Sequence, residues 1–281
     1  MRQDGNRISL YTERSVSQCL ETAFDFMRSC RNVWFKMVLW LFLPPCLVAT
    51  FVIKGGVSNM NGSFAAFDCW SYLVQKNVIL APFIGMWLAL VLVHALLDAY
   101  GQQGAAVDGF SMRQMLPYLR RQVLRSGWLS FLFPFSFLAS NGWEILVFVA
   151  WLLFSLLPSV YLLERLNFWR SVFKSVRLSV RSILSLVAVV FFALLFGFLM
   201  LTALYMPIEL MAMAKIVFPV GDVLGSVATT LFSGLFFTLF LVGYEVVLSM
   251  LLLVLACHYG SVSERVDDAS LESDIENFEN L

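Results

Sequence analysis

Long runs of apolar residues, separated by short polar segments, recur along most of this 281-residue chain. A helix needs about 20 apolar residues to cross a hydrocarbon core of roughly 30 Å. The pattern therefore predicts an all-α, polytopic helical membrane protein with a single transmembrane domain over residues 1–260. Six spans are expected, at about residues 33–53, 78–100, 119–139, 144–163, 183–205 and 226–259.

The third span is the least regular of the six. Its strongly apolar part is only Trp128–Ala139, which contains Pro134, and it reaches crossing length only when it is extended back to Leu119. A re-entrant hairpin is the alternative. If this segment did not cross while the fourth did, the basic segment 165–181 would lie outside. Spans three and four are therefore expected to cross together or not at all.

The distribution of Lys and Arg predicts the orientation. Sixteen of the 19 cations fall in segments 1–36, 101–127, 164–182 and the C-terminal tail, whereas the opposite side holds only Lys54, Lys76 and Lys215. Loops rich in Lys and Arg stay in the cytoplasm. We expect a multi-pass protein of the cell (inner) membrane with both termini cytoplasmic.

Residues 261–281 differ in kind from the rest of the chain. They hold seven acidic residues and one arginine, with few apolar residues. A segment of this composition cannot bury enough apolar surface to fold alone. It is expected to be an acidic, disordered cytoplasmic tail, and one alternative is that it docks a protein partner.

Three cytoplasmic segments have the pattern of amphipathic helices. In Ser15–Asn32 and Ser111–Ser126, a serine three residues before a glutamine predicts a capping box at the helix start. The expected apolar stripes are Val16, Leu20, Phe24 and Met27 in the first segment, and Met115, Leu119 and Val123 in the second.

The third segment, Asn167–Ser182, has the sharpest division between its faces. Its expected apolar face is Trp169, Val172, Phe173, Val176 and Val180, and its basic face is Arg170, Lys174, Arg177 and Arg181. Such a helix sinks its apolar face into the bilayer while its cations meet anionic headgroups. The spans then form three hairpins, each preceded by an interfacial helix. The alternative is that these segments are positive loops that happen to be helical.

The run Tyr161-Leu-Leu-Glu164, followed by Arg170-Ser-Val-Phe-Lys174-Ser175, resembles the signature of a broad bacterial group of multi-helix membrane proteins. That group includes the membrane domain of some glycerophosphodiester phosphodiesterases and uncharacterised stand-alone relatives. The resemblance implies the helix-hairpin layout and a cell-membrane location. The group usually has glycine after the glutamate, where this chain has Arg165, and no soluble phosphodiesterase domain is present to carry that activity over.

Ionisable residues inside predicted spans are the natural candidates for a functional site, because burying them is costly. Glu245, beside Tyr244, lies midway along the last span and could be a proton or cation site, or a carboxyl group bonded within the bundle. His94 and Asp98 are one helical turn apart, and His258 could approach them. An orienting hydrogen bond is favoured over a metal site there. Glu164 is expected to pair with Arg165 or with a cation of the following helix.

These observations favour a non-enzymatic protein that organises membrane lipids or binds another protein. Its main expected partner is the lipid bilayer, through the anionic headgroups of the cytoplasmic face. No P-loop, HExxH, GxSxG or paired-cysteine motif occurs. No catalytic residues, metal ligands or cofactor are expected, nor a nucleic-acid surface. The alternative function is a transporter or channel that uses Glu245. An intramembrane enzyme built on His94, Asp98 and His258 is the third hypothesis.

Overall fold

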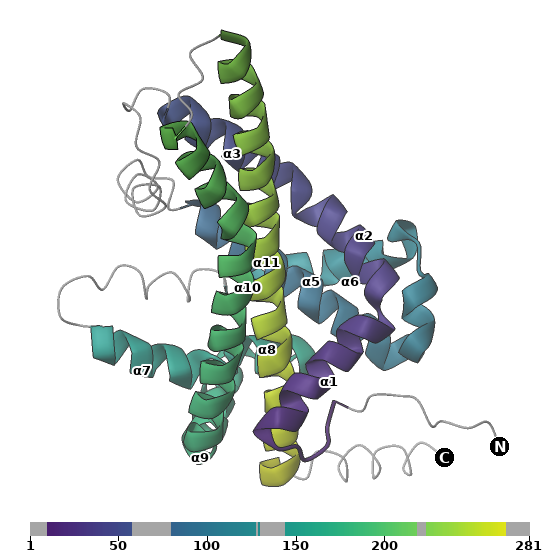
Figure 1. Ribbon diagram of the computed structural model, residues 1–281. Coiled ribbons are helices and arrows are strands. Elements are labelled where there is room, and N and C mark those ends of the chain that lie inside the picture. The colour runs from purple at the N-terminus through teal and green to yellow at the C-terminus, as the bar shows by residue number, and fades with distance from the viewer. Residues whose placement is uncertain (1–9, 58–79, 128, 130–143, 218–222, 268–281) are drawn as a thin grey trace.

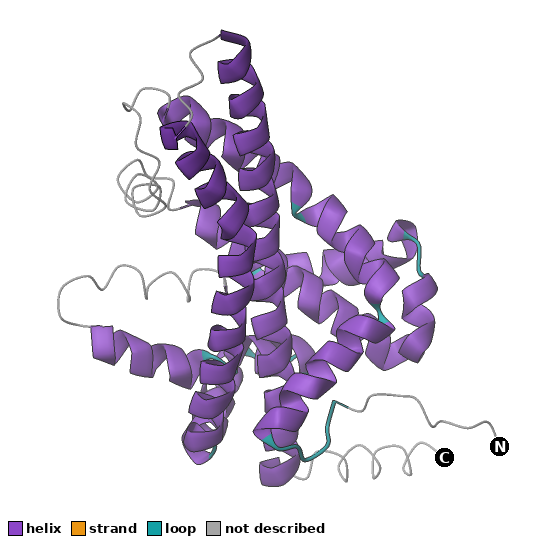
Figure 2. Ribbon diagram, in the orientation of Figure 1, coloured by secondary structure: helices purple, strands orange, loops and turns teal. Residues whose placement is uncertain are grey.

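The computed structural model describes residues 10–57, 80–127, 129, 144–217 and 223–267. Every regular element in this part of the chain is helical, as Figure 2 shows. The expectation of an all-α fold is confirmed.

Within the described residues, four stretches are long and apolar enough to cross a membrane: Arg31–Thr50, Ile84–Gln103, Ile183–Pro207 and Gly234–Asp267. They lie in α2 (Arg31–Leu41) with α3 (Leu43–Val57), in α5 (Leu80–Gln103), in α10 (Ile183–Val217) and in α11 (Val223–Asp267). These correspond to the expected first, second, fifth and sixth spans. The structure thus places helices of crossing length at four of the six expected positions.

The other two expected spans differ from their predictions. Leu119–Ser126, the expected start of the third span, belongs instead to the amphipathic helix α6 (Met112–Ser126), and residues 130–143 lie outside the described part of the chain. The fourth span is not one helix but two short ones, α7 (Glu144–Phe154) and α8 (Leu157–Leu163). Pro158 explains the break, because it has no N–H to donate to the carbonyl of Phe154 and its ring crowds that carbonyl.

Proline also divides the first span. Pro44 and Pro45 lie in the first turn of α3, where their missing N–H groups cost little, but they cannot continue the hydrogen bonding of α2. The two helices therefore meet at Phe42, which is fully buried.

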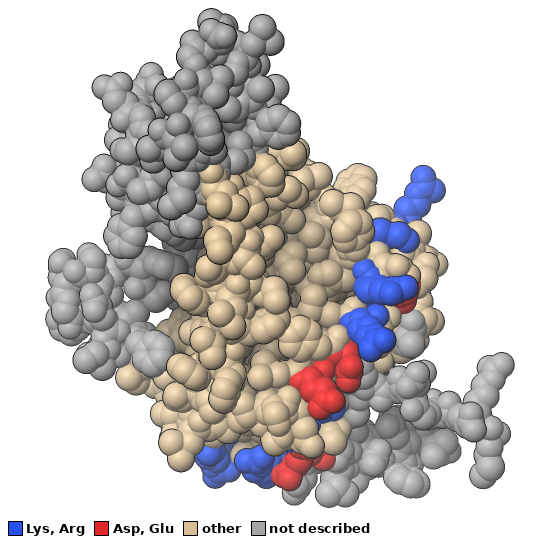
Figure 3. Space-filling model, viewed as in Figure 1, with Lys and Arg blue, Asp and Glu red and all other residues tan. Residues whose placement is uncertain are grey.

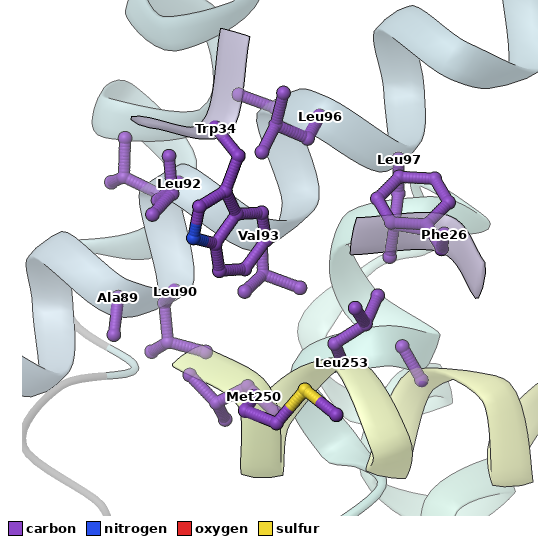
Figure 4. Close-up of a cluster of buried hydrophobic side chains, with 14 of the residues drawn as sticks. Phe26, Trp34, Ala89, Leu90, Leu92, Val93, Leu96, Leu97, Met250 and Leu253 are labelled. Carbon is purple, nitrogen blue, oxygen red and sulfur yellow. The ribbon is translucent and has the colours of Figure 1, made fainter. Parts of the chain in front are cut away.

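Two central helices form the core. All of α5 from Ala89 to Leu97 is buried, and so is α11 from Ser249 to Ser263 except for Leu251. A helix that is apolar on every side must be covered on every side. In α11 this cover comes from α1 (Val16–Ser29), α5, α8, α9 (Phe168–Arg181) and α10. Figure 4 shows where side chains of four helices meet in this core: Phe26, Trp34, Ala89, Leu90, Leu92, Val93, Leu96, Leu97, Met250 and Leu253.

The outer face of α10 is apolar and uncovered. α10 runs beside α11 (Figure 1) and packs closely on it, because Gly243 leaves room for Leu204 and Gly197 for Val247. Its other side exposes a series of large apolar side chains, among them Leu184, Phe191, Phe198 and Leu199. Exposed apolar surface on this scale is rare on soluble monomers and is compatible with a membrane protein.

The three amphipathic segments are all helical. α1 begins at the Ser15–Gln18 capping box and α6 at the Ser111–Gln114 capping box, as expected. The stripe predicted for α1 is not its most buried face. The residues buried in α1 are Cys19, Ala23 and Phe26, followed by Cys30 directly after the helix, because α1 packs directly on α11 and α10. In α6, Met115 and Leu119 are buried as expected and Val123 is exposed.

The expectation of a tail starting at Ser261 is wrong for its first seven residues. α11 continues to Asp267, and Ser261 and Ser263 are buried. The N-terminal segment covers this end of α11, since the Arg14 N–H donates to the Ser261 hydroxyl at 2.8 Å and that hydroxyl donates to the Arg14 carbonyl at 3.1 Å. Residues 268–281 lie outside the described part.

Candidate functional site

Helix α9 has three chemically different faces. Residues three and four apart share a face of a helix, and here the buried face consists of Ser171, Ser175, Leu178 and Ser179. The basic residues form a second face. The apolar residues expected to point into the membrane form the third face, and three of them are strongly exposed: Trp169 (70%), Phe173 (73%) and Val180 (56%).

The break between α7 and α8 explains the buried serines. The hydroxyl groups of Ser175 and Ser179 donate to the carbonyl of Leu153, at 3.3 and 3.0 Å. Leu153 lies one residue before the end of α7, where a helix leaves carbonyl groups without partners. The serines satisfy this carbonyl and hold α9 against α7. The sequence alone does not predict that these serines are buried, because a helix face rich in serine usually contacts water.

The outward faces of α9 combine apolar and basic side chains. Arg170 and Arg181 are exposed and lie beside Trp169, Phe173 and Val180. Figure 3 shows that charged side chains gather along the lower and right-hand margins of the visible surface, whereas the described surface above them is uncharged. An exposed apolar stripe bordered by cations is typical of helices that lie in the plane of a membrane surface.

Two of the four basic residues of α9 form ion pairs with carboxylates of the same chain. The Lys174 ammonium lies 2.6 Å from Glu164 and 3.1 Å from Asp267, and Arg177 lies 3.3 Å from Asp267. The Tyr259 hydroxyl also donates to Glu164. The expected pairing of Glu164 with a cation of the following helix is confirmed. This cluster of Glu164, Lys174, Arg177, Tyr259 and Asp267, the α8–α9–α11 cluster, fixes α9 to the end of α11.

The charge state of Lys174 follows from its neighbours. Burial alone would lower its pKa, but the hydrogen bonds and negative charges of Glu164 and Asp267 outweigh burial and raise the pKa above its ordinary value. Lys174 is therefore a fixed cation that holds two carboxylates together. The sequence does not single out Asp267, because its composition places this residue in the expected tail.

Asp98 has basic partners rather than His94. It pairs with Arg121 at 3.2 Å and with Arg165 at 3.3 Å, which ties α5 to α6 and to the turn after α8. Arg165 has a φ of 56°, in the left-handed region that favours glycine. The Asp98 pairs hold a strained turn whose backbone leads into α9.

The two histidines are buried in the bundle. Nδ1 of His94 bonds to the carbonyl of Leu90 at 2.9 Å, and not to Asp98. Nε2 of His94 and Nε2 of His258 have no partner among the described residues. Within the described part of the chain, no three His, Cys, Asp or Glu side chains cluster in a way that could hold a metal ion. The structure does not assemble the His94–Asp98–His258 set.

Glu245 lies where α11 crosses α5. Only 9% of it is exposed. A Cβ at Gly85 would lie 2.0 Å from its Oε1, so the carboxyl group occupies the place of a side chain on α5. Its Oε2 is buried and has no partner among the described residues. Tyr244, next to it, is partly buried. The sequence singled out Glu245 but gave no reason to pair it with Gly85.

Searches of protein-family models, of curated proteins and of solved structures return no match to this chain.

Proposed function

We propose that this chain is a multi-pass protein of the cell (inner) membrane, with both termini cytoplasmic, that binds anionic lipid headgroups through α9 and organises the membrane around it without catalysing a reaction. The observation that carries the proposal is the outward apolar face of α9 beside its exposed arginines. The internal anchoring of α9 supports it, since the serines and the α8–α9–α11 cluster hold the other faces against the bundle.

The four cations of α9 differ in their partners within the protein. Lys174 and Arg177 already have carboxylate partners, so Arg170 and Arg181 are the cations left to meet lipid phosphates. A test of lipid binding should therefore change Arg170 and Arg181 and leave Lys174 intact. Changing all four cations together would also release α9 from α11, so an effect on lipid binding could not be told from an effect on the packing of α9.

Replacing Arg170 and Arg181 by glutamine is expected to remove much of the preference for anionic lipid. Each cation near a lipid surface contributes about 1 kcal/mol to binding, so the relative affinity for anionic lipid should fall by up to about 30-fold. The measurement is the association of spin-labelled phosphatidylglycerol and phosphatidylcholine with the reconstituted protein. Added salt should weaken the wild-type preference, because it screens surface charge.

The matched control replaces Arg28 and Arg31, which are exposed at the α1–α2 junction, by glutamine and so changes the net charge equally. This control should keep most of the wild-type preference. Equal losses in the two variants, or no loss in either, would contradict the assignment of lipid binding to α9.

A second candidate function is transport, with Glu245 as an intramembrane proton or cation site. The observation that favours it is the buried, unpartnered Oε2 of Glu245 at the contact between α5 and α11. Proteoliposome flux measured for the wild type and for Glu245→Gln tests the coupling. An identical proton-dependent flux in both would remove Glu245 from that role.

A further inference from the structure

We infer that Glu245 is a proton-binding site, and that the bound proton allows its carboxyl group to pack against Gly85 and hold α11 on α5. This inference does not rest on lipid binding by α9 and would stand if that proposal failed. It also differs from the transport hypothesis, because it names the ligand as a proton and assigns it a role in helix packing.

The packing leaves no room for water between the carboxyl group and α5. A Cβ at Gly85 would lie 2.0 Å from Oε1, 2.9 Å from Cδ and 3.1 Å from Oε2 of Glu245. The whole carboxyl group thus lies against the backbone of α5. An ionised carboxylate in such a place would have lost its hydration without a replacement, which costs several kcal/mol.

The described groups around Glu245 supply no compensating positive charge. Cys46 on α3 lies close enough to interact with it electrostatically, and Tyr244 adjoins it on α11. Tyr205 is the one ionisable group on α10 among its described side chains, and it packs on Phe240. Lys54 lies two turns beyond Cys46, and its side chain is outside the described part.

The same surroundings favour a proton over a metal cation. Sodium, calcium and magnesium ions need several oxygen ligands, and magnesium keeps waters as well. The described ionisable neighbours are a thiol and a phenol beside the carboxyl group itself, and no cluster of metal-binding side chains occurs in the described part of the chain. A proton needs only one carboxyl oxygen, so it is the ligand that this site can hold.

Loss of the proton would therefore weaken the contact between α5 and α11. Thr238 lies seven residues before Glu245 on the same face of α11, and its hydroxyl lies 2.9 Å from that of Thr50 on α3. The contact among α3, α5 and α11 thus has a hydrogen bond between two hydroxyls at one level and the carboxyl group against Gly85 at the next. An ionised Glu245 would draw water into this contact and loosen α5 from α11.

Infrared spectroscopy of the reconstituted protein tests the bound proton directly. At neutral pH the wild type should show the C=O stretching band of a protonated carboxyl group. This band should be absent in Glu245→Gln and retained in Glu164→Gln, which removes a carboxylate paired with Lys174. Raising the pH should remove the band from the wild type. A Glu245→Gln spectrum that instead loses a carboxylate band at neutral pH would overturn the inference.

Two further measurements keep the test decisive. In Gly85→Ala, the added methyl group should displace the carboxyl group, and the protonated band should then vanish at a lower pH than in the wild type. An unchanged titration would contradict the packing role of the proton. If Glu245→Gln does not fold, labelling of the wild type with a hydrophobic carbodiimide, which reacts with protonated carboxyl groups, gives the answer. An adduct on Glu245 at neutral pH that declines at alkaline pH supports the inference, and no adduct at neutral pH overturns it.

Discussion

Replacing Gly260 by alanine is expected to detach the N-terminal segment from α11 and to destabilise the protein by about 1–3 kcal/mol, the usual cost of adding atoms to a well-packed core. A Cβ at Gly260 would lie 2.2 Å from the carbonyl oxygen of Leu10 and 2.9 Å from its carbonyl carbon. Because both are backbone atoms, no side-chain rotation can relieve the clash. The segment from Leu10 to Arg14 would have to move away.

That movement would break identifiable contacts. The two hydrogen bonds between Arg14 and Ser261 and the edge-to-face contact between Tyr11 and Tyr259 all depend on this approach. Trypsin cleavage after Arg14, followed by mass spectrometry, should therefore be much faster in Gly260→Ala than in the wild type. The thermal unfolding midpoint in detergent gives the accompanying loss of stability.

Gly101→Ala is the matched control for this substitution. Gly101 also lies in a helix, but a Cβ there would meet no atom within 4 Å. Alanine is favoured over glycine in a helix by roughly 0.5–1 kcal/mol, so this variant should be as stable as the wild type or more so. If Gly260→Ala behaved like Gly101→Ala in both assays, the close contact between Leu10 and α11 would be excluded.

Replacing Lys174 by methionine should cost about 1–3 kcal/mol. Lys174 lies between Glu164 and Asp267, whose side chains are only 17% and 18% exposed. Without the ammonium group, two partly buried carboxylates would remain near each other with fewer cations. Breaking a fully buried pair costs about 3–5 kcal/mol and an exposed pair contributes at most about 1 kcal/mol, so this intermediate site should lie between those limits.

Arg170→Met controls for the loss of one positive charge on the same helix and should change the unfolding midpoint little, because Arg170 is exposed. Adding Asp267→Asn to Lys174→Met should restore part of the lost stability by removing one of the two carboxylates. Equal midpoints for Lys174→Met and Arg170→Met would show that the α8–α9–α11 cluster does not anchor α9.

The pH dependence of this effect has a definite sign. The folded protein raises the pKa of Lys174, so its contribution is fully present below the ordinary value of 10.5 and is lost as the pH rises through the higher folded value. The difference between the wild type and Lys174→Met should therefore remain constant near neutral pH and shrink only in strongly alkaline solution.

Local chemistry made much of this fold predictable. The capping boxes at Ser15 and Ser111 involve residues three positions apart, and the structure contains both. The position of α9 and the burial of Glu245 also follow from the local sequence. Such features depend on helix periodicity and on the cost of burying charge, which a sequence displays directly.

Contacts between distant segments were not predictable in the same way. The serines of α9 are buried because a broken helix presents the Leu153 carbonyl to them. The end of α11 is covered because Gly260 leaves room for the backbone of the N-terminal segment. In the sequence Gly260 is a glycine directly after the last expected span, and only the structure shows that the backbone of Leu10 lies against it.

The most direct test of the account concerns the depth of Trp169, which is 70% exposed on the apolar face of α9. The measurement is the tryptophan emission of the reconstituted wild type minus that of Trp169→Phe, with lipids brominated near the headgroup end of the acyl chain or with aqueous iodide. If α9 lies in the membrane surface, the brominated lipid should quench this difference emission strongly and iodide should quench it little. Strong quenching by iodide together with no effect of brominated lipid would contradict the placement of α9 in the membrane surface.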